Sequence, residues 1–361
     1  MDEPVGERAV GVGIAAGSRP GFQGLEVDRR SRWSASRHPV AMFLLRRVSA
    51  GLVTLVVASI LIFLATSALP GDVAEITLGR FATPKRVNHL RDELDLNRPL
   101  VVQYGSWIGN AVQGDLGHST VQAANGAKAA PVWHLTRTPL RNSLVLAVIT
   151  IALLIPLALV VGTAAGVRAG KAVDYSVSYG ALIIGSLPEF VVGTFLITIL
   201  FSQLDVLPPV ALVPPGGSPF DHIDSLVMPV LTLLAVSLAF SARQVRAGVA
   251  EVMRQEYVPM ARLSGISERR ILWRYALRNA LAPSVQTFAQ SIQYLFGGII
   301  VVEALFSYPG IGQMLVEAVS ERDVTLVQGI TLVLAAAYIA INILADLIVV
   351  FLVPKLRTGL Q

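Results

Sequence analysis

The sequence predicts an all-α membrane protein whose helices cross the bilayer six times and whose two termini lie in the cytoplasm. Three observations predict it: an apolar composition, six long apolar runs, and basic residues beside alternate connections. Of the 361 residues, 53% are hydrophobic and 15% are charged, whereas a soluble domain carries roughly 25% charged residues. The chain has no cysteine, which excludes a disulfide scaffold, a thiolate metal site and a cysteine nucleophile.

The six apolar runs match the thickness of a bilayer. A hydrocarbon core about 30 Å thick needs roughly 20 mostly apolar residues, because a helix rises about 1.5 Å per residue. The runs cover about 48–69, 144–166, 177–204, 226–240, 284–306 and 326–353. The fourth is the shortest, and Pro229 lies near its start, so its ends are the least defined.

The basic residues set the orientation, since short cytoplasmic connections collect Lys and Arg. They flank the first, second, third and sixth runs on one side, as Arg46, Arg47, Arg168, Lys171, Lys355 and Arg357. Eight further arginines lie between the fourth and fifth runs. On the opposite side, 205–225 has no Lys or Arg and 307–325 has only Arg322. Both termini are therefore expected in the cytoplasm.

Two segments lie outside this pattern. Residues 1–41 are rich in Gly, Arg and Ser and lack helical or strand periodicity, so we expect a disordered cytoplasmic leader. A start at Met42 would explain the same segment equally well. The first run is longer than the core of a secretory signal, which favours a retained signal anchor. Residues 70–142 mix eight basic residues with acids, and we interpret them as a small external subdomain.

The connection 241–283 carries the clearest local pattern. Pro259 suits the first turn of a short helix that Gly265 would end. A second helix is expected to start at Ser267, whose hydroxyl is suited to cap it, with Glu268 at the positive end of the helix dipole. Behind it, Arg270, Arg274 and Arg278 recur at i, i+4 and i+8 as a basic face. Taken alone, this face is equally consistent with a helix lying on anionic headgroups.

The residues from Glu256 to Arg270, EYVPMARLSGISERR, followed by YALRNALAP ending at Pro283, resemble the coupling-loop signature of bacterial ABC importer permeases. The similarity is to the dipeptide/oligopeptide (peptide/nickel) class in particular. In that family the loop docks into a groove of a cytoplasmic ATPase and transmits its closure to the membrane helices. The resemblance implies coupling roles for Glu256, Tyr257, Ala261, Arg262, Gly265, Ser267 and Arg270.

Further patches resemble the same family along almost the whole chain after Met42, among them LPGD ending at Asp72, GDLG ending at Gly117, EALFSYPGIG ending at Gly312, and Arg322-Asp323. Two features depart from the general pattern: the leader, and Pro259-Met260-Ala261 in place of Glu-Ala-Ala. The second is usual in the peptide branch. The resemblance implies a type I ABC importer permease fold over 42–361, in the bacterial cell membrane.

The partners follow from the resemblance as well. It implies a second homologous permease as the other half of a heterodimer, two cytoplasmic ATPase domains, and an extracellular or lipid-anchored peptide-binding protein. ATP and Mg would bind to the partner subunits, and this chain would carry no cofactor of its own. The residues agree, because Gly166-Val-Arg-Ala-Gly-Lys171 lacks the spacing and the hydroxyl of a phosphate-binding loop. The five histidines show no i, i+4 pair, and no nucleophile motif occurs.

Polar residues inside the runs mark a candidate translocation path, since they are costly in lipid. In the fifth run Gln286, Gln290, Gln293 and Tyr294 fall at i, i+4, i+7 and i+8, on one helical face. Amide side chains donate and accept hydrogen bonds, which suits peptide amides and carbonyls. Hydrogen bonding that only holds helices together is an equally weighted alternative. Glu189, midway through the third run, is either a structural carboxyl or an attraction for a cationic group.

Other functions stay open on these residues. A nickel or glutathione importer permease of the same family would look similar. A secondary transporter driven by an ion gradient would be expected to show paired ionisable residues near the midplane and inverted repeats. A membrane anchor or scaffold would use the glutamine face for packing alone. Substrate identity and an enzymatic role have no support in the sequence itself, and we expect a transport subunit rather than an enzyme.

Overall fold

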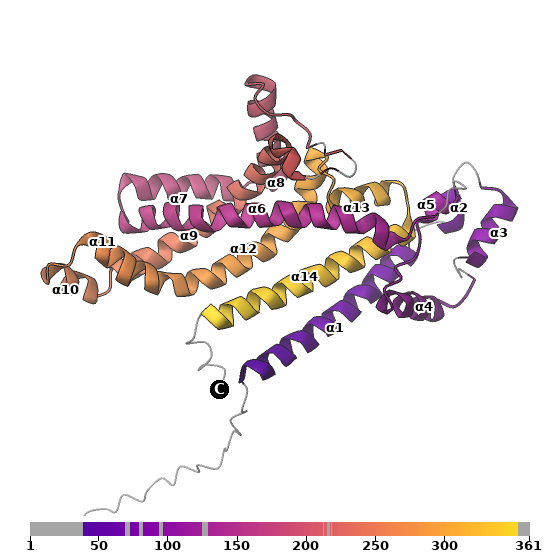
Figure 1. The fold of residues 1–361 in the computed structure, drawn as a ribbon, viewed down its shortest axis with the longest axis horizontal. Coiled ribbons are helices and arrows are strands. Elements are labelled where there is room, and N and C mark those ends of the chain that lie inside the picture. The colour runs from indigo at the N-terminus through magenta and orange to yellow at the C-terminus, as the bar shows by residue number, and fades with distance from the viewer. Residues whose placement is uncertain are drawn as a thin grey trace, which may run out of the picture. The chain divides into compact units, whose positions relative to one another are not determined.

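The structure is a computed structural model, which describes residues 39–68, 73–78, 82–93, 97–124, 129–211, 213–214, 217 and 219–352 (Figure 1). All of them belong to one compact unit, His38–Gln361. The regular elements of these residues are helices. Five are long and apolar enough to cross a membrane, and a bent pair provides a sixth candidate. The predicted leader lies outside the described residues up to residue 38, and the first helix, α1, spans Pro39–Ser67.

The five long helices are α1, α6 (Val132–Val167), α9 (Ile223–Met253), α12 (Leu277–Phe306) and α14 (Val324–Leu352). Five of the six predicted apolar runs fall within these helices to one or two residues, with two corrections. Helix α6 starts at Val132, so its first turns lie in the segment 70–142 that we expected to be outside the membrane bundle. Helix α9 continues well past residue 240, where the sequence analysis placed the end of the fourth run.

The extension of α9 has a simple cause. Beyond Phe240 only one face of the helix stays apolar or small, with Ala242, Val245 and Val249 buried against the bundle. The other face carries Arg243 and other polar residues. The mean hydropathy of the sequence therefore drops after Phe240, although the helix and its buried face continue.

The third predicted run is a broken helix. Helix α7 (Ala172–Gly185) and helix α8 (Glu189–Leu196), which runs on through a π-helical segment to Gln203, meet at 105°. Pro188 causes the break, because proline has no N–H to donate and disfavours helical geometry at the residue before it. The prediction of one continuous span was therefore wrong, and Glu189 is the first residue of α8 instead of the middle of a helix.

Helices α6 and α9 pack most closely. A Cβ atom on Gly162 would lie 2.6 Å from the carbonyl oxygen of Ala242, and one on Gly166 would lie 2.9 Å from that of Arg246. Small residues let helix backbones approach in this way. One buried cluster joins α6, α9 and α12 through Leu146, Met228, Leu233, Leu295 and Phe306. Helices α1 and α14 lie side by side in Figure 1, and Arg47 pairs with Asp346 at 3.2 Å.

The short helices between α1 and α6 are α2 (Val73–Leu78), α3 (Pro84–Glu93), α4 (Leu100–Val112) and α5 (Thr120–Ala124). Helix α13 (Ile311–Ser320) lies between α12 and α14 in the chain. Helix α4 docks on α1, where Tyr104 and Trp107 surround Phe63 and the Tyr104 hydroxyl lies 2.9 Å from that of Ser59. Asp323, before α14, is buried and accepts hydrogen bonds from the Thr120 hydroxyl (2.9 Å) and the Thr120 backbone N–H (3.2 Å). The segment 70–142 is thereby attached to α1 through α4 and to the start of α14 through α5.

Candidate functional site

The segment after α9 forms a compact helical turn at one end of the bundle. Helix α10 (Tyr257–Leu263) is followed by Gly265 and then by α11 (Glu268–Arg270). Gly265 has φ +76°, which favours glycine because a Cβ atom is strained there. No atom lies within 4 Å of the position of such a Cβ, so the constraint is the backbone conformation and not crowding. The predicted short helix and glycine corner are both present.

The second predicted short helix does not stand alone. Helix α11 runs through a π-helical segment, Ile271–Ala276, directly into α12. Residues 268–282 contain no glycine or proline. Nothing therefore ends the helix between its amphipathic start at Glu268 and the residues up to Ala282. The loop that we assigned to 241–283 is therefore reduced to the residues between Met253 and Glu268. The rest of that segment, from Glu268 onward, belongs to the helical run that leads into α12.

An exposed ion pair closes the turn. Arg262 donates to the two carboxylate oxygens of Glu268 at 2.7 and 3.3 Å, across Gly265. The guanidinium holds the pKa of Glu268 below its usual value. The predicted cap is absent, since the Ser267 side chain makes no capping bond; only its carbonyl accepts, from the N–H groups of Arg270 and Ile271. The Glu268 carboxylate therefore pairs with Arg262 instead of the N–H groups at the helix start, and Ser267 contributes only its backbone carbonyl.

The other predicted loop residues split between contact and exposure. The ring of Tyr257 lies 6.5 Å from that of Tyr275, between α10 and the π-helical segment, and Ala261 is half-buried. Glu256 and Arg270 are exposed. Two residues that sequence reasoning missed are Met260 and Leu263, whose exposed fractions are 66% and 86%. Their signal was available, because they are apolar residues three apart on a short helix in a polar loop.

Two buried apolar side chains pack the turn against the rest of the chain. Val258 of α10 and Ile271, just after α11, are both fully buried. Met260 and Leu263 are exposed on the same short helix. The turn therefore presents two exposed apolar side chains beside the Arg262–Glu268 ion pair.

The glutamine face of α12 is exposed on the isolated chain. Gln286, Gln290 and Tyr294 are exposed and Gln293 is half-buried, while Ser284, Thr287 and Ser291 point into the bundle. The bond from α12 to α9 comes from that buried face, where the hydroxyl of Ser291 lies 2.8 Å from that of Ser241.

Glu189 joins the same face. Its carboxylate lies beside Tyr294, and a Cβ atom on Gly298, one turn further, would lie 3.1 Å from its Oε1. The break at Pro188 turns the start of α8 toward α12 and brings this residue there. The structure thus places Glu189 and Tyr294 beside one another on the side of α12 that carries the glutamines.

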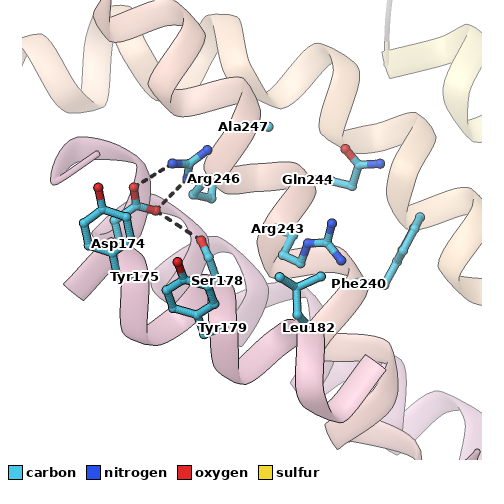
Figure 2. Close-up of a pocket in the computed structure, with 10 residues that line it drawn as sticks. All are labelled: Asp174, Tyr175, Ser178, Tyr179, Leu182, Phe240, Arg243, Gln244, Arg246 and Ala247. Carbon is cyan, nitrogen blue, oxygen red and sulfur yellow. Dashed lines mark hydrogen bonds and ion pairs between the residues drawn. The ribbon is translucent and has the colours of Figure 1, made fainter. Parts of the chain in front are cut away.

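A second polar site, which sequence reasoning missed, links α7 to α9 (Figure 2). Asp174, with 3% of its side chain exposed, accepts two hydrogen bonds from Arg246, at 2.7 and 2.6 Å, and one from Ser178 at 3.2 Å. A cavity of about 470 Å³ lies beside the pair, lined by Tyr175, Tyr179 and Leu182 of α7 and by Phe240, Arg243, Gln244 and Ala247 of α9. The pair ties α7 to the last turns of α9, directly before the exposed turn.

The opposite end of α12 is closed by backbone contacts. Glu303 is buried and accepts from the N–H of Gly312 at 2.7 Å. Tyr308 donates to the carbonyl of Asn142, whose amide donates to the carbonyl of Pro309, both at 2.9 Å. The motif around Tyr308-Pro309-Gly310 is therefore a rigid link between α6, α12 and α13. Among the described residues, no three His, Asp or Glu side chains gather as metal ligands.

The chain matches known proteins over nearly all of this architecture. Residues 155–358 match the family model described as binding-protein-dependent transport system inner membrane component, and residues 40–154 match its N-terminal companion. A peptide transport system permease protein of Brucella abortus (strain 2308) is 33% identical over 314 residues, which is 87% of this chain and 98% of the relative.

An oligopeptide transport system permease protein of Bacillus subtilis (strain 168) is 30% identical over 320 residues, which is 88% of this chain and all of the relative. Both relatives span the region that carries the exposed turn and the glutamine face. With the apolar helices and the two family matches, these findings establish that the chain belongs to the ABC importer permeases of the peptide transport class, multi-pass proteins of the bacterial inner membrane.

Proposed function

We propose that the chain forms half of the translocation path of an ATP-driven importer of di- and oligopeptides. A second, homologous permease supplies the other half. Two cytoplasmic ATPase domains bind ATP and Mg and dock on the exposed turn Glu256–Arg270, and an external binding protein delivers the substrate. The chain itself contributes no catalytic step.

One observation carries the proposal: α11, the last helix of the exposed turn, and the glutamine face belong to one uninterrupted helical run, from Glu268 through Phe306. A force on α10 passes across Gly265 into that run, because the Arg262–Glu268 pair and the buried Val258 hold the turn together. The same force reaches α7 through α9 and the Asp174–Arg246 pair. Movement of the ATPase would thereby reorient the polar face.

The polar face suits a peptide. The side chains of Gln286, Gln290 and Gln293 make no hydrogen bond with another described residue, although unsatisfied amides are costly in lipid. They therefore need water, a substrate or a second subunit. Each offers a donor and an acceptor, which match the peptide backbone without selecting a side chain. Glu189 extends this face with a carboxylate suited to a free amino terminus.

The test is Gly265→Trp in the assembled transporter, with Gly265→Asn as its control. Asparagine tolerates a left-handed backbone better than tryptophan, and a Cβ atom at this position meets no other atom within 4 Å. We expect Gly265→Trp to insert and assemble but to lose uptake of a labelled tripeptide while ATP hydrolysis continues. Gly265→Asn should retain most of the uptake. Normal uptake by the tryptophan variant would remove the coupling role of the turn.

The same uptake assay, with the wild-type transporter in lipid vesicles, distinguishes the substrate classes. Competition with unlabelled tripeptide, glutathione or nickel should reduce uptake for the tripeptide alone. Competition by nickel or glutathione at lower concentration would replace the peptide assignment by one of those substrates.

A further inference from the structure

An apolar groove of about 840 Å³ lies between the second half of α6 and the π-helical segment that leads into α12, and its described lining includes none of the glutamines of α12. Its α6 wall consists of Pro156, Leu159, Val160, Thr163, Ala164 and Val167, and its other wall of Leu272, Trp273 and Leu277. Arg168 and Arg274 complete the lining.

The two arginines belong to the cytoplasmic end of the groove. Arg168 follows the last residue of α6, and Arg274 lies three residues before α12 begins. Neither makes an ion pair or a side-chain hydrogen bond with another described residue, and no acidic residue is among the described residues that line the groove. The end of the groove thus holds two uncompensated positive charges.

The remaining lining is apolar except for the buried Thr163, and part of it is strongly exposed. Val160 is 67% exposed and Trp273 is 72% exposed. Pro156, Val160 and Ala164 recur every four residues, so they form one stripe along α6 that ends at Arg168. A tryptophan beside arginines is typical of the level of the lipid headgroups.

The length of the stripe matches one leaflet. The 12 steps from Pro156 to Arg168 rise about 18 Å at about 1.5 Å per residue. Half of a hydrocarbon core about 30 Å thick is about 15 Å. The groove therefore reaches from the headgroup level to the middle of the bilayer.

We propose that this groove binds an anionic phospholipid of the cytoplasmic leaflet. The phosphate lies between Arg168 and Arg274, with Trp273 beside the headgroup, and an acyl chain follows the stripe on α6. Basic pockets between membrane helices on this side are suited to anionic headgroups. Because Arg274 stands in the helical run that joins the exposed turn to α12, a bound lipid would hold the base of that run against α6.

Native mass spectrometry of the full chain, purified in mild detergent with the subunits it retains, tests the site. The probes are phosphatidylglycerol and phosphatidylcholine of identical acyl chains. We expect phosphatidylglycerol to bind more tightly, and the double variant Arg168→Gln/Arg274→Gln to weaken it about 30-fold, since each basic residue near the surface contributes about fivefold. Phosphatidylcholine binding should hardly change.

Controls separate this site from general charge. The double variant Arg46→Gln/Arg254→Gln removes the same charge from exposed positions outside the groove lining and should leave the lipid preference intact. A third variant, Ala164→Trp, fills the stripe and should weaken the binding of both lipids.

Four outcomes would overturn the proposal. Equal binding of the two lipids by the wild-type chain would remove the charge argument. Equal losses in the two arginine double variants would assign the preference to net charge. Displacement of the bound lipid by millimolar inorganic phosphate would leave a phosphate site without the acyl-chain groove. Absence of any bound lipid in the wild-type chain would indicate that a protein subunit covers the groove.

Discussion

The Asp174–Arg246 pair makes the sharpest prediction, because it is the buried link between α7 and α9. Alanine at either position leaves the other charge buried and unpaired. Breaking a fully buried pair costs about 3–5 kcal/mol. Here 32% of the Arg246 side chain is exposed, so water can compensate part of the loss, and we expect about 2–3 kcal/mol for Asp174→Ala.

A double-mutant cycle isolates the pair. Asp174→Ala, Arg246→Ala and the double variant are compared with the wild type by equilibrium unfolding in mixed detergent micelles. We expect the double variant to be no less stable than Asp174→Ala alone. The coupling energy then equals in magnitude the destabilisation by Arg246→Ala, which we expect to be at least about 2 kcal/mol because it leaves the buried Asp174 carboxylate without its cation. A coupling energy below about 0.5 kcal/mol would refute the reasoning that this pair holds α7 to α9. Uptake measured on Asp174→Ala that still inserts should fall, since α7 then no longer follows α9.

Three further predictions concern the turn, the helix packing and the polar face. Since Arg262 lowers the pKa of Glu268, the contribution of their pair is complete above the usual value near 4.5 and is lost as the pH falls through the lowered pKa. ATPase binding by the chain, measured by pull-down from pH 7 to 3.5, should therefore stay constant to about pH 5 and weaken below it. The variant Glu268→Gln should lose that pH dependence. A wild-type pH profile equal to that of the variant would contradict the assignment. Gly162→Leu should destabilise the chain by about 1–3 kcal/mol or more by separating α6 from α9, whereas Gly180→Leu, in open space, should change stability by less than about 0.5 kcal/mol in the same unfolding assay. Gln290→Leu should leave unfolding unchanged within about 0.5 kcal/mol but lower tripeptide uptake, and unchanged uptake would assign this face to packing.

The amino-acid sequence alone determined the membrane class, the positions of most spans and the identity of the exposed turn. These features depend on local chemistry. Apolar length sets a span, and Gly265 predicts a left-handed corner because only glycine adopts one without strain. The spacing of Gln286, Gln290 and Gln293 predicts one polar face because the helical period is fixed.

Other features were decided by contacts between residues far apart in the chain. Asp174 and Arg246 are 72 positions apart, and nothing local marks either as buried or paired. The extension of α9 past Phe240 depends on the groove that Gly162 and Gly166 offer to it. Ser267 looked like a helix cap, yet Glu268 turned to Arg262 and the helix ran on into α12. Local pattern specifies which surfaces a helix has, whereas only tertiary packing decides which partner meets each surface, because that choice depends on the shape and charge of distant segments.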